Sequence, residues 1–335
     1  MADILNLAAA NLLSPMVLFF ALGLAAALAR SDLAIPEAVA KGMSIYLMMA
    51  IGFKGGAGVA AHGLDATLIL ALIAGLILSA LIPVVAFQIL TRVSDLPRVD
   101  AAAVVAHYGS ISIVTFLAAT EALKISGIPA ESYMVAVAAA METPAIFVGL
   151  ILAQSATSTS GSRGSSTGEV GNLDRTALRE VVLNGSIVVL VGSFIIGWIS
   201  GPAGLTSIES FIVSPFKGVL CLFLLDMGLI AGRGLRDGSK QLSPSVVAFG
   251  LYMPLVGAVM GLVAGLLVGL SPGGIALMIT LSASASYIAV PAAMRLALPE
   301  ARPAIYLPLS LGVTFPFNLV IGIPLYIAMA TAVTG

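Results

Sequence analysis

The sequence predicts an all-α polytopic membrane protein with ten transmembrane helices in a 5+5 inverted repeat. Composition, the spacing of apolar segments and the placement of basic residues predict it. The 335 residues are 59% hydrophobic and only 9% charged, with a mean hydropathy of +1.11, whereas soluble domains are about 25% charged. So much apolar surface requires a bilayer as solvent. A net charge of -1 argues against a nucleic-acid partner.

Ten apolar segments follow one another, and most reach the ~20 residues that a helix needs to cross a bilayer. They cover residues 13–30, 36–53, 66–91, 100–123, 130–155, 180–200, 209–231, 244–270, 274–294 and 303–333. Residues 156–179 are rich in Ser, Gly and Thr, which predicts a flexible linker. The domains expected are therefore a first repeat over 1–155 and a second over 180–335. The first residues lack a basic region, so a mature N-terminus is expected rather than a signal peptide.

The basic residues test the number of segments. With the N-terminus outside, twelve of the 15 Lys and Arg residues fall at cytoplasmic loops or helix ends, a strong positive-inside bias. The other side keeps only Lys54, Lys124 and Lys217. This pattern predicts a multi-pass protein of the cell (inner) membrane, with both termini outside and the linker in the cytoplasm.

The two halves also resemble each other. Residues 51–58 match 227–234, residues 109–113 match 283–287, and residues 142–150 match 314–322, at offsets of 176, 174 and 172. Five spans per half is an odd number, so the second copy starts from the opposite side of the membrane. Transporters built from such inverted repeats bind their substrates near the bilayer midplane.

Two serine-rich clusters are predicted to lie at that depth. Ser110 follows Arg98 by 12 residues and Ser284 precedes Arg295 by 11, so continuous helices place them roughly 18 and 16 Å from one membrane edge. Gly109 permits a helix break, and the ends of broken helices suit a small anion or a cation. The candidates for substrate binding are Tyr108, Gly109, Ser110, Ile111, Ser112, Ser282, Ser284, Ser286 and Tyr287. The alternative is close packing of small residues between helices.

Glu142 is the most informative single residue, because a carboxylate ~20 Å into a membrane segment is costly. Pro144 frees a backbone carbonyl near it. The candidate sodium ligands are Ser110, Glu142, Thr143, Thr314 and Asn318. A structural carboxylate held by hydroxyls or a base is the alternative.

Three other polar features favour simpler interpretations. Lys54 is expected to snorkel from an outer helix end. Glu121 and Lys124 are three residues apart and are expected to form a surface pair. His107 is interpreted mainly as a hydrogen-bonded packing residue.

An enzyme is not expected. The sequence has no G-x-S-x-G motif, no P-loop and no Cys/His cluster for a metal, and Cys221 is its single cysteine. No organic cofactor is predicted.

The chain resembles the sodium-dependent bicarbonate transporter family, best known from cyanobacteria. The short motifs on which the resemblance rests occur in the order found in the family, over nearly the whole chain. They are Ser14-Pro15, Ile35-Pro36-Glu37, Gly52 with Gly55-Gly56, Gly109-Ser110, Ile128-Pro129, Glu142-Thr143-Pro144, Met227-Gly228 and residues 298–308.

The resemblance implies a gate subdomain from segments 1, 2, 6 and 7 and a substrate-carrying core from the others. It further implies a homotrimer in membrane lipid, uptake of bicarbonate coupled to sodium ions, and an elevator-like movement of the core. In cyanobacterial members a small PII-like protein binds the cytoplasmic side, so such a regulator is a possible partner here.

Residue by residue, Gly109, Ser110, Glu142, Ser284 and Ser286 match family positions, with Glu142 replacing an aspartate. Two departures stand out: Ile111 replaces a hydroxyl residue, and Tyr287 replaces an aspartate. The chain therefore resembles a divergent, non-cyanobacterial member.

The first hypothesis is a sodium-driven symporter of a small anion, with bicarbonate as the main candidate. A second keeps the fold but changes the substrate to another small carboxylate or inorganic anion. A third is a non-transporting membrane sensor.

Overall fold

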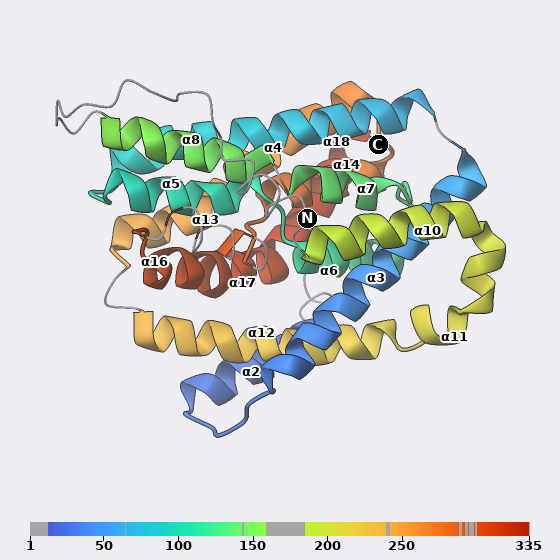
Figure 1. The fold of residues 1–335 in the computed structure, drawn as a ribbon, viewed down its shortest axis with the longest axis horizontal. Coiled ribbons are helices and arrows are strands. Elements are labelled where there is room, and N and C mark those ends of the chain that lie inside the picture. Colours follow the sequence, from blue (N-terminus) through green and yellow to red (C-terminus); the bar gives the residue numbers. More distant parts are fainter. Residues whose placement is uncertain are drawn as a thin grey trace.

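The computed structural model describes residues 13–334 except 64, 143, 159–184, 239–241, 288, 289, 292, 293, 295–297 and 299. Within these residues the fold is all-helical (Figure 1). The helices are α2 (Pro15–Leu28), α3 (Glu37–His62), α4 (Ala66–Val93), α5 (Arg98–Gly109), α6 (Ile113–Ile125), α7 (Met134–Met141), α8 (Pro144–Ser158), α10 (Gly185–Ser207), α11 (Glu209–Ile212), α12 (Phe216–Gly238), α13 (Pro244–Val268), α14 (Pro272–Ala283), α16 (Pro303–Leu307), η1 (Pro308–Thr314), α17 (Phe315–Phe317), η2 (Asn318–Gly322) and α18 (Ile323–Thr334).

Eight segments in the described part are long and apolar enough to cross a membrane, and α2 and α14 are shorter apolar helices. A multi-pass all-α protein is therefore confirmed. The predicted ten spans remain an inference from the sequence. The expected linker at 156–179 lies outside the described residues, apart from the last turn of α8, which ends at Ser158.

Local sequence signals explain where several helices begin and end. Ser14 caps α2, with its Oγ accepting from Val17 N at 3.4 Å, and Ser271 caps α14 in the same way. Proline follows each of these serines, where its missing N–H costs nothing. Gly269 ends α13 with a left-handed φ of 78°, a conformation that favours glycine.

The helices pack as two groups. We call α2, α3, α10 and α12 group A, and α4 to α8 with α13 to α18 group B; group A lies along the lower and right parts of Figure 1. Within group A the backbones come very close. A Cβ on Gly23 would run into the Leu225 carbonyl of α12, and one on Gly197 into the Phe53 carbonyl of α3.

Four of the predicted membrane segments are interrupted in group B. The α-helix is interrupted at 110–112, at Glu142 and after Ala283, and the last segment changes from α-helix to π-helix in η1 and η2. The sequence-based depths assumed continuous helices, so those distances do not hold past the breaks. α5 and α14 each have 12 residues, and they begin and end at the same offset of 174.

Basic side chains mark two opposite ends of the molecule. Lys217 lies in the first turn of α12 and Arg233 near its other end, roughly 24 Å apart at 1.5 Å per residue. Lys54 and Lys124 line one pocket near Lys217, and we call this the lysine end. Arg233 and residues beside Arg302 line a cavity at the other end, which we call the arginine end.

Candidate functional site

The breaks after α5 and α14 meet inside group B, and we call this meeting point the crossing. Ser286 N donates to the His107 carbonyl at 2.7 Å, and Ser112 N donates to Ser284 Oγ at 2.9 Å. Ser284 Oγ in turn donates to the Leu281 carbonyl at 2.9 Å. Backbone groups that a continuous helix would satisfy are therefore satisfied across the two clusters.

Ser112 also starts α6. Its Oγ accepts from Thr115 N at 3.2 Å and from Thr115 Oγ1 at 2.9 Å, the usual arrangement of a helix N-cap. Ser110, two residues earlier, has extended backbone angles (φ -88°, ψ 152°). The N-terminus of α6 therefore points into a buried crossing, where its partial positive charge favours an anion.

Some polar atoms at and near the crossing have no hydrogen-bond partner. They include the Oγ atoms of Ser110 and Ser282, both nearly inaccessible. The Tyr287 hydroxyl lies beside Ser112 without a well-formed hydrogen bond. Ser282 Oγ faces Gly261 of α13, so it belongs to the α13–α14 contact. Buried orphan hydroxyls are costly, which makes Ser110 and Tyr287 candidates for contact with a ligand.

Tyr108 and Thr314 form a separate pair beside the crossing. Thr314 Oγ1 donates to the Gly250 carbonyl at 2.8 Å, so its 2.6 Å contact with Tyr108 is a hydrogen bond donated by the tyrosine. The Tyr108 ring packs edge-on against Phe249, with centroids 5.0 Å apart. Both hydroxyls thus already have partners, and Thr314 retains one lone pair for a cation.

Asn318 holds the end of α14. Its Nδ2 donates to the Ala283 carbonyl at 2.9 Å, and its Oδ1 accepts from the Tyr326 hydroxyl at 2.6 Å. The side chain therefore satisfies a backbone carbonyl at the end of the broken helix, a structural role that the sequence did not indicate. Its assignment as a sodium ligand stays a prediction that relies on the second lone pair of Oδ1.

Glu142 lies at the break between α7 and α8. Its side chain is buried and its Oε2 has no hydrogen-bond partner. Ser79 of α4 supports the break: its Oγ donates to the Met141 carbonyl at 2.6 Å and accepts from Ala145 N at 3.2 Å. The expected neighbour Thr143 lies outside the described residues.

The two breaks of the first half adjoin each other. A Cβ on Gly109 would collide with Pro83 of α4 and Ala145 of α8, so only glycine lets α5 approach them. Ser110 and Glu142 therefore belong to neighbouring breaks. A carboxylate with nearby hydroxyl and carbonyl oxygens suits a hard cation such as sodium.

A cavity of about 500 Å³ leads from the arginine end to Tyr287. Its other walls come from α12, α16 and η1, so it lies between groups A and B. Tyr287 is one of the two positions at which the sequence departs from the residues that the resemblance implies. Ile111, the second departure, is fully buried and offers no polar group to the crossing.

His107 is a packed and bonded side chain, as expected. Its Nδ1 donates to the Ala103 carbonyl at 2.6 Å, and its ring lies against Tyr306 with centroids 4.6 Å apart. Its Nε2 is an acceptor without a partner.

Sequence reasoning missed Ser79 and Tyr326, which support the breaks. A serine four residues before Pro83 in a long apolar helix was a usable signal for Ser79. Tyr326 carried no local signal, because its role depends on Asn318. The expected pair of Glu121 with Lys124 is present, with Nζ and Oε1 2.8 Å apart. Its expected place at the surface was wrong for Glu121, because that side chain is only 2% exposed and also meets Lys217 of α12.

Comparison with known proteins supplies the family. No curated protein matches the chain. A family model described as the Na⁺-dependent bicarbonate transporter superfamily matches residues 15–331, nearly the whole chain. The chain therefore belongs to the Na⁺-dependent bicarbonate transporter superfamily.

Proposed function

We propose that this protein is a sodium-dependent symporter of a small anion, with bicarbonate as the first candidate. The crossing is the observation that carries the proposal. Two broken helices meet there, with the buried, unpaired Ser110 hydroxyl at the start of α6 and Tyr287 facing a cavity. Broken helices at mid-membrane are a common plan for ion-coupled transport.

In this proposal the anion and the sodium ion occupy adjacent places. The N-terminus of α6, with Ser110, Ser112 and Tyr287, holds the anion. Glu142, Ser110 and the carbonyls freed at the α7–α8 break hold sodium, with Thr143, Thr314 and Asn318 as further ligands. Sodium beside the anion offsets its charge in a medium of low dielectric constant, which couples the two binding events.

Two features support an elevator movement of a 5+5 inverted repeat. α5 and α14 match in length and offset, as expected of repeated halves. Group A comprises predicted gate segments, and group B corresponds to the predicted core. By the positive-inside rule the arginine end is cytoplasmic, so in this proposal the cavity that reaches Tyr287 opens toward the cytoplasm. The homotrimer and the PII-like regulator rest on the family resemblance alone.

The test is uptake of labelled bicarbonate into proteoliposomes with and without an inward sodium gradient. Glu142→Gln should lower sodium-dependent uptake by about tenfold or more, the effect of losing roughly 1.4 kcal/mol of ion binding. Glu209→Gln, at an exposed carboxylate on α11, is the matched control. Uptake that does not depend on the sodium gradient, in correctly oriented protein, would refute the proposal. Unchanged sodium dependence in Glu142→Gln would refute the assignment of Glu142 as a sodium ligand.

A second candidate is the same mechanism with a different small carboxylate or inorganic anion. It is favoured by Tyr287, an aromatic side chain on the cavity wall in place of the family's aspartate. A panel of anions tested with sodium for thermal stabilisation separates the two, because a ligand of the native state raises its stability. If an anion other than bicarbonate stabilises the protein but no anion of the panel is taken up, the result would instead favour the sensor hypothesis.

A further inference from the structure

The lysine end holds a second polar pocket, outside the crossing. It has a volume of about 240 Å³, and its walls include Lys54, Glu121, Lys124 and Glu131. Lys54 comes from α3 of group A, and Lys124 from α6 of group B. Lys217 of α12 meets Glu121 here as well, so three lysines from three helices gather at one place.

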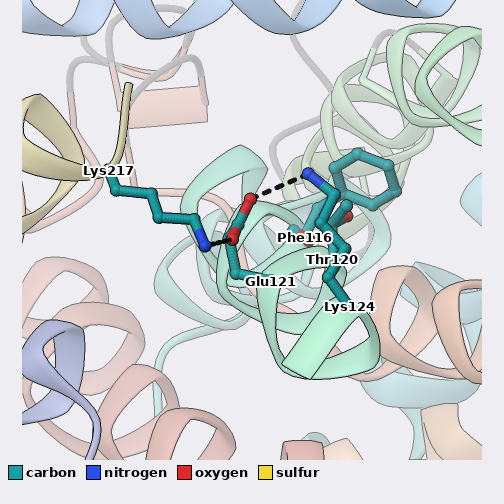
Figure 2. Close-up of polar contacts among 5 residues, drawn as sticks. All are labelled: Phe116, Thr120, Glu121, Lys124 and Lys217. Atoms are coloured by element: carbon teal, nitrogen blue, oxygen red, sulfur yellow. Dashed lines mark hydrogen bonds and ion pairs between the residues drawn. The ribbon is translucent and has the colours of Figure 1, made fainter. Parts of the chain in front are cut away.

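Glu121 neutralises two of these lysines, as Figure 2 shows. Its Oε1 binds Lys124 Nζ at 2.8 Å, and its Oε2 forms an ion pair with Lys217 Nζ at 2.9 Å. The Glu121 side chain is 2% exposed, whereas those of Lys124 and Lys217 are 57% and 65% exposed. Lys124 and Lys217 therefore already have a carboxylate partner, supplied by the chain itself.

Lys54 has no such partner. Its Nζ lies 4.2 Å from the centroid of the Phe216 ring, and no described carboxylate lies within ion-pair distance of it. The second carboxylate of the pocket, on Glu131, accepts from Ser271 N at 2.7 Å and from Ser271 Oγ at 2.9 Å. The half-buried Lys54 ammonium therefore faces the pocket without a counter-anion.

The pocket wall strengthens the field of this charge. Phe116, Leu117, Leu277 and Val135 line it together with the lysines. Apolar walls lower the effective dielectric constant, so a charge acts more strongly there than at an open surface. A half-buried ammonium is favoured when an anion compensates it.

We propose that this pocket is a second anion site, which takes a small oxyanion of the size of bicarbonate between Lys54 and Lys124. Glu121 is its built-in competitor, because its carboxylate binds the same ammonium group of Lys124. The site lies at the end opposite the Tyr287 cavity. Only the choice of bicarbonate as the probe rests on the proposed function.

The test uses a cysteine reporter in the pocket. Thr120 lines it, so Thr120→Cys is introduced into a chain that carries Cys221→Ser and Glu142→Gln, the second to weaken the crossing. Rates of modification by a negatively and a positively charged methanethiosulfonate are compared, with and without bicarbonate at constant ionic strength. We expect the negative reagent to react about fivefold faster or more, and bicarbonate to slow it.

Matched variants at Lys54 decide the assignment. Lys54→Gln should remove both the charge preference and the protection by bicarbonate, whereas Lys54→Arg, which keeps the charge, should retain them. Lys41→Gln, on the same helix toward its other end, should change neither. No protection by bicarbonate, or equal protection in folded Lys54→Gln, would overturn the proposal.

Failures of the two proposals are distinguishable. Protection is measured in the Thr120→Cys chain and uptake in the unsubstituted protein, because the reporter chain carries Glu142→Gln. Protection without any sodium-dependent uptake would support the pocket and refute the transport function. Uptake with normal sodium dependence but no protection would refute the pocket alone.

Discussion

Each end of the molecule buries one carboxylate in an ion pair, but the two pairs join different parts. At the arginine end, Asp100 accepts from Arg302 N, Nε and Nη2 at 2.8, 2.9 and 2.7 Å. This contact joins α5 to the start of α16, within group B. At the lysine end, Glu121 of group B meets Lys217 of group A.

The difference separates a structural contact from one that depends on the relative position of the two groups. In the proposed elevator movement the Asp100 pair would stay intact, because both of its partners belong to group B. The Glu121–Lys217 pair must break if the groups shift past each other. The cavity at the arginine end reaches Tyr287, whereas the linings of two lysine-end cavities, of about 240 and 620 Å³, do not include this residue.

The strongest test of the contrast is Asp100→Ala. It removes three hydrogen bonds to a charged group and leaves Arg302 N unpaired, so it should cost about 2 kcal/mol of stability. The melting temperature in detergent measures this loss. Asp32→Ala, at an exposed aspartate, should have no such effect, and an unchanged melting temperature in Asp100→Ala would contradict the structural role.

Tyr287→Phe probes the cavity at the arginine end. The hydroxyl has no well-formed hydrogen bond, so its removal should leave the melting temperature unchanged. If it binds the anion, the KM for uptake should rise about fivefold to tenfold, equivalent to one hydrogen bond. Tyr252→Phe, which also lacks a partner, is the control. An unchanged KM would remove Tyr287 from the anion site.

Glu121→Gln should loosen the lysine end without unfolding the protein. The pair with Lys217 is worth up to about 1 kcal/mol, so its loss should shift the opening equilibrium by up to about fivefold. The reporter is the modification rate of Ile51→Cys, at a buried wall residue of the pocket, in a Cys221→Ser chain. Lys217→Gln should have the same effect. A rate that neither variant changes would show that the pair does not hold the groups together.

Lys124→Gln should have the smallest effect. Lys124 and Glu121 lie on the same helix, so their contact cannot oppose a movement of one group past the other. Its loss should change the Ile51→Cys rate by less than about twofold, as expected for a helical pair worth about 0.3 kcal/mol. A change as large as that of Lys217→Gln would erase the distinction between pairs within and between groups.

Much of the crossing was predictable. The match of residues 109–113 with 283–287 placed two breaks at equivalent positions, and α5 and α14 do end there, at Gly109 and Ala283. Helix breaking is a local property of glycine and serine, so the sequence contains its signal. At Glu142 the sequence indicated only a carbonyl freed by Pro144, within a segment expected to be continuous over 130–155.

The partners of the polar groups were less predictable. The sequence predicts that Asn318 is a cation ligand. In the structure its amide nitrogen donates a hydrogen bond to the Ala283 carbonyl, and its amide oxygen accepts one from the Tyr326 hydroxyl. Glu121 read as one half of a surface pair, because Lys124 is near in sequence and Lys217 is 96 residues away. Ser282 resembled the other serines but faces Gly261.

The sequence by itself determined that this protein lies in a membrane, where its apolar segments are, and where the helices break at Gly109 and Ala283. These follow from hydropathy and backbone preference, which act over a few residues. Only the tertiary structure decided which hydroxyls lack partners, which carboxylate joins the two groups and which cavity reaches Tyr287. Those properties depend on how distant helices pack, because a buried polar group is satisfied by whatever the fold places beside it.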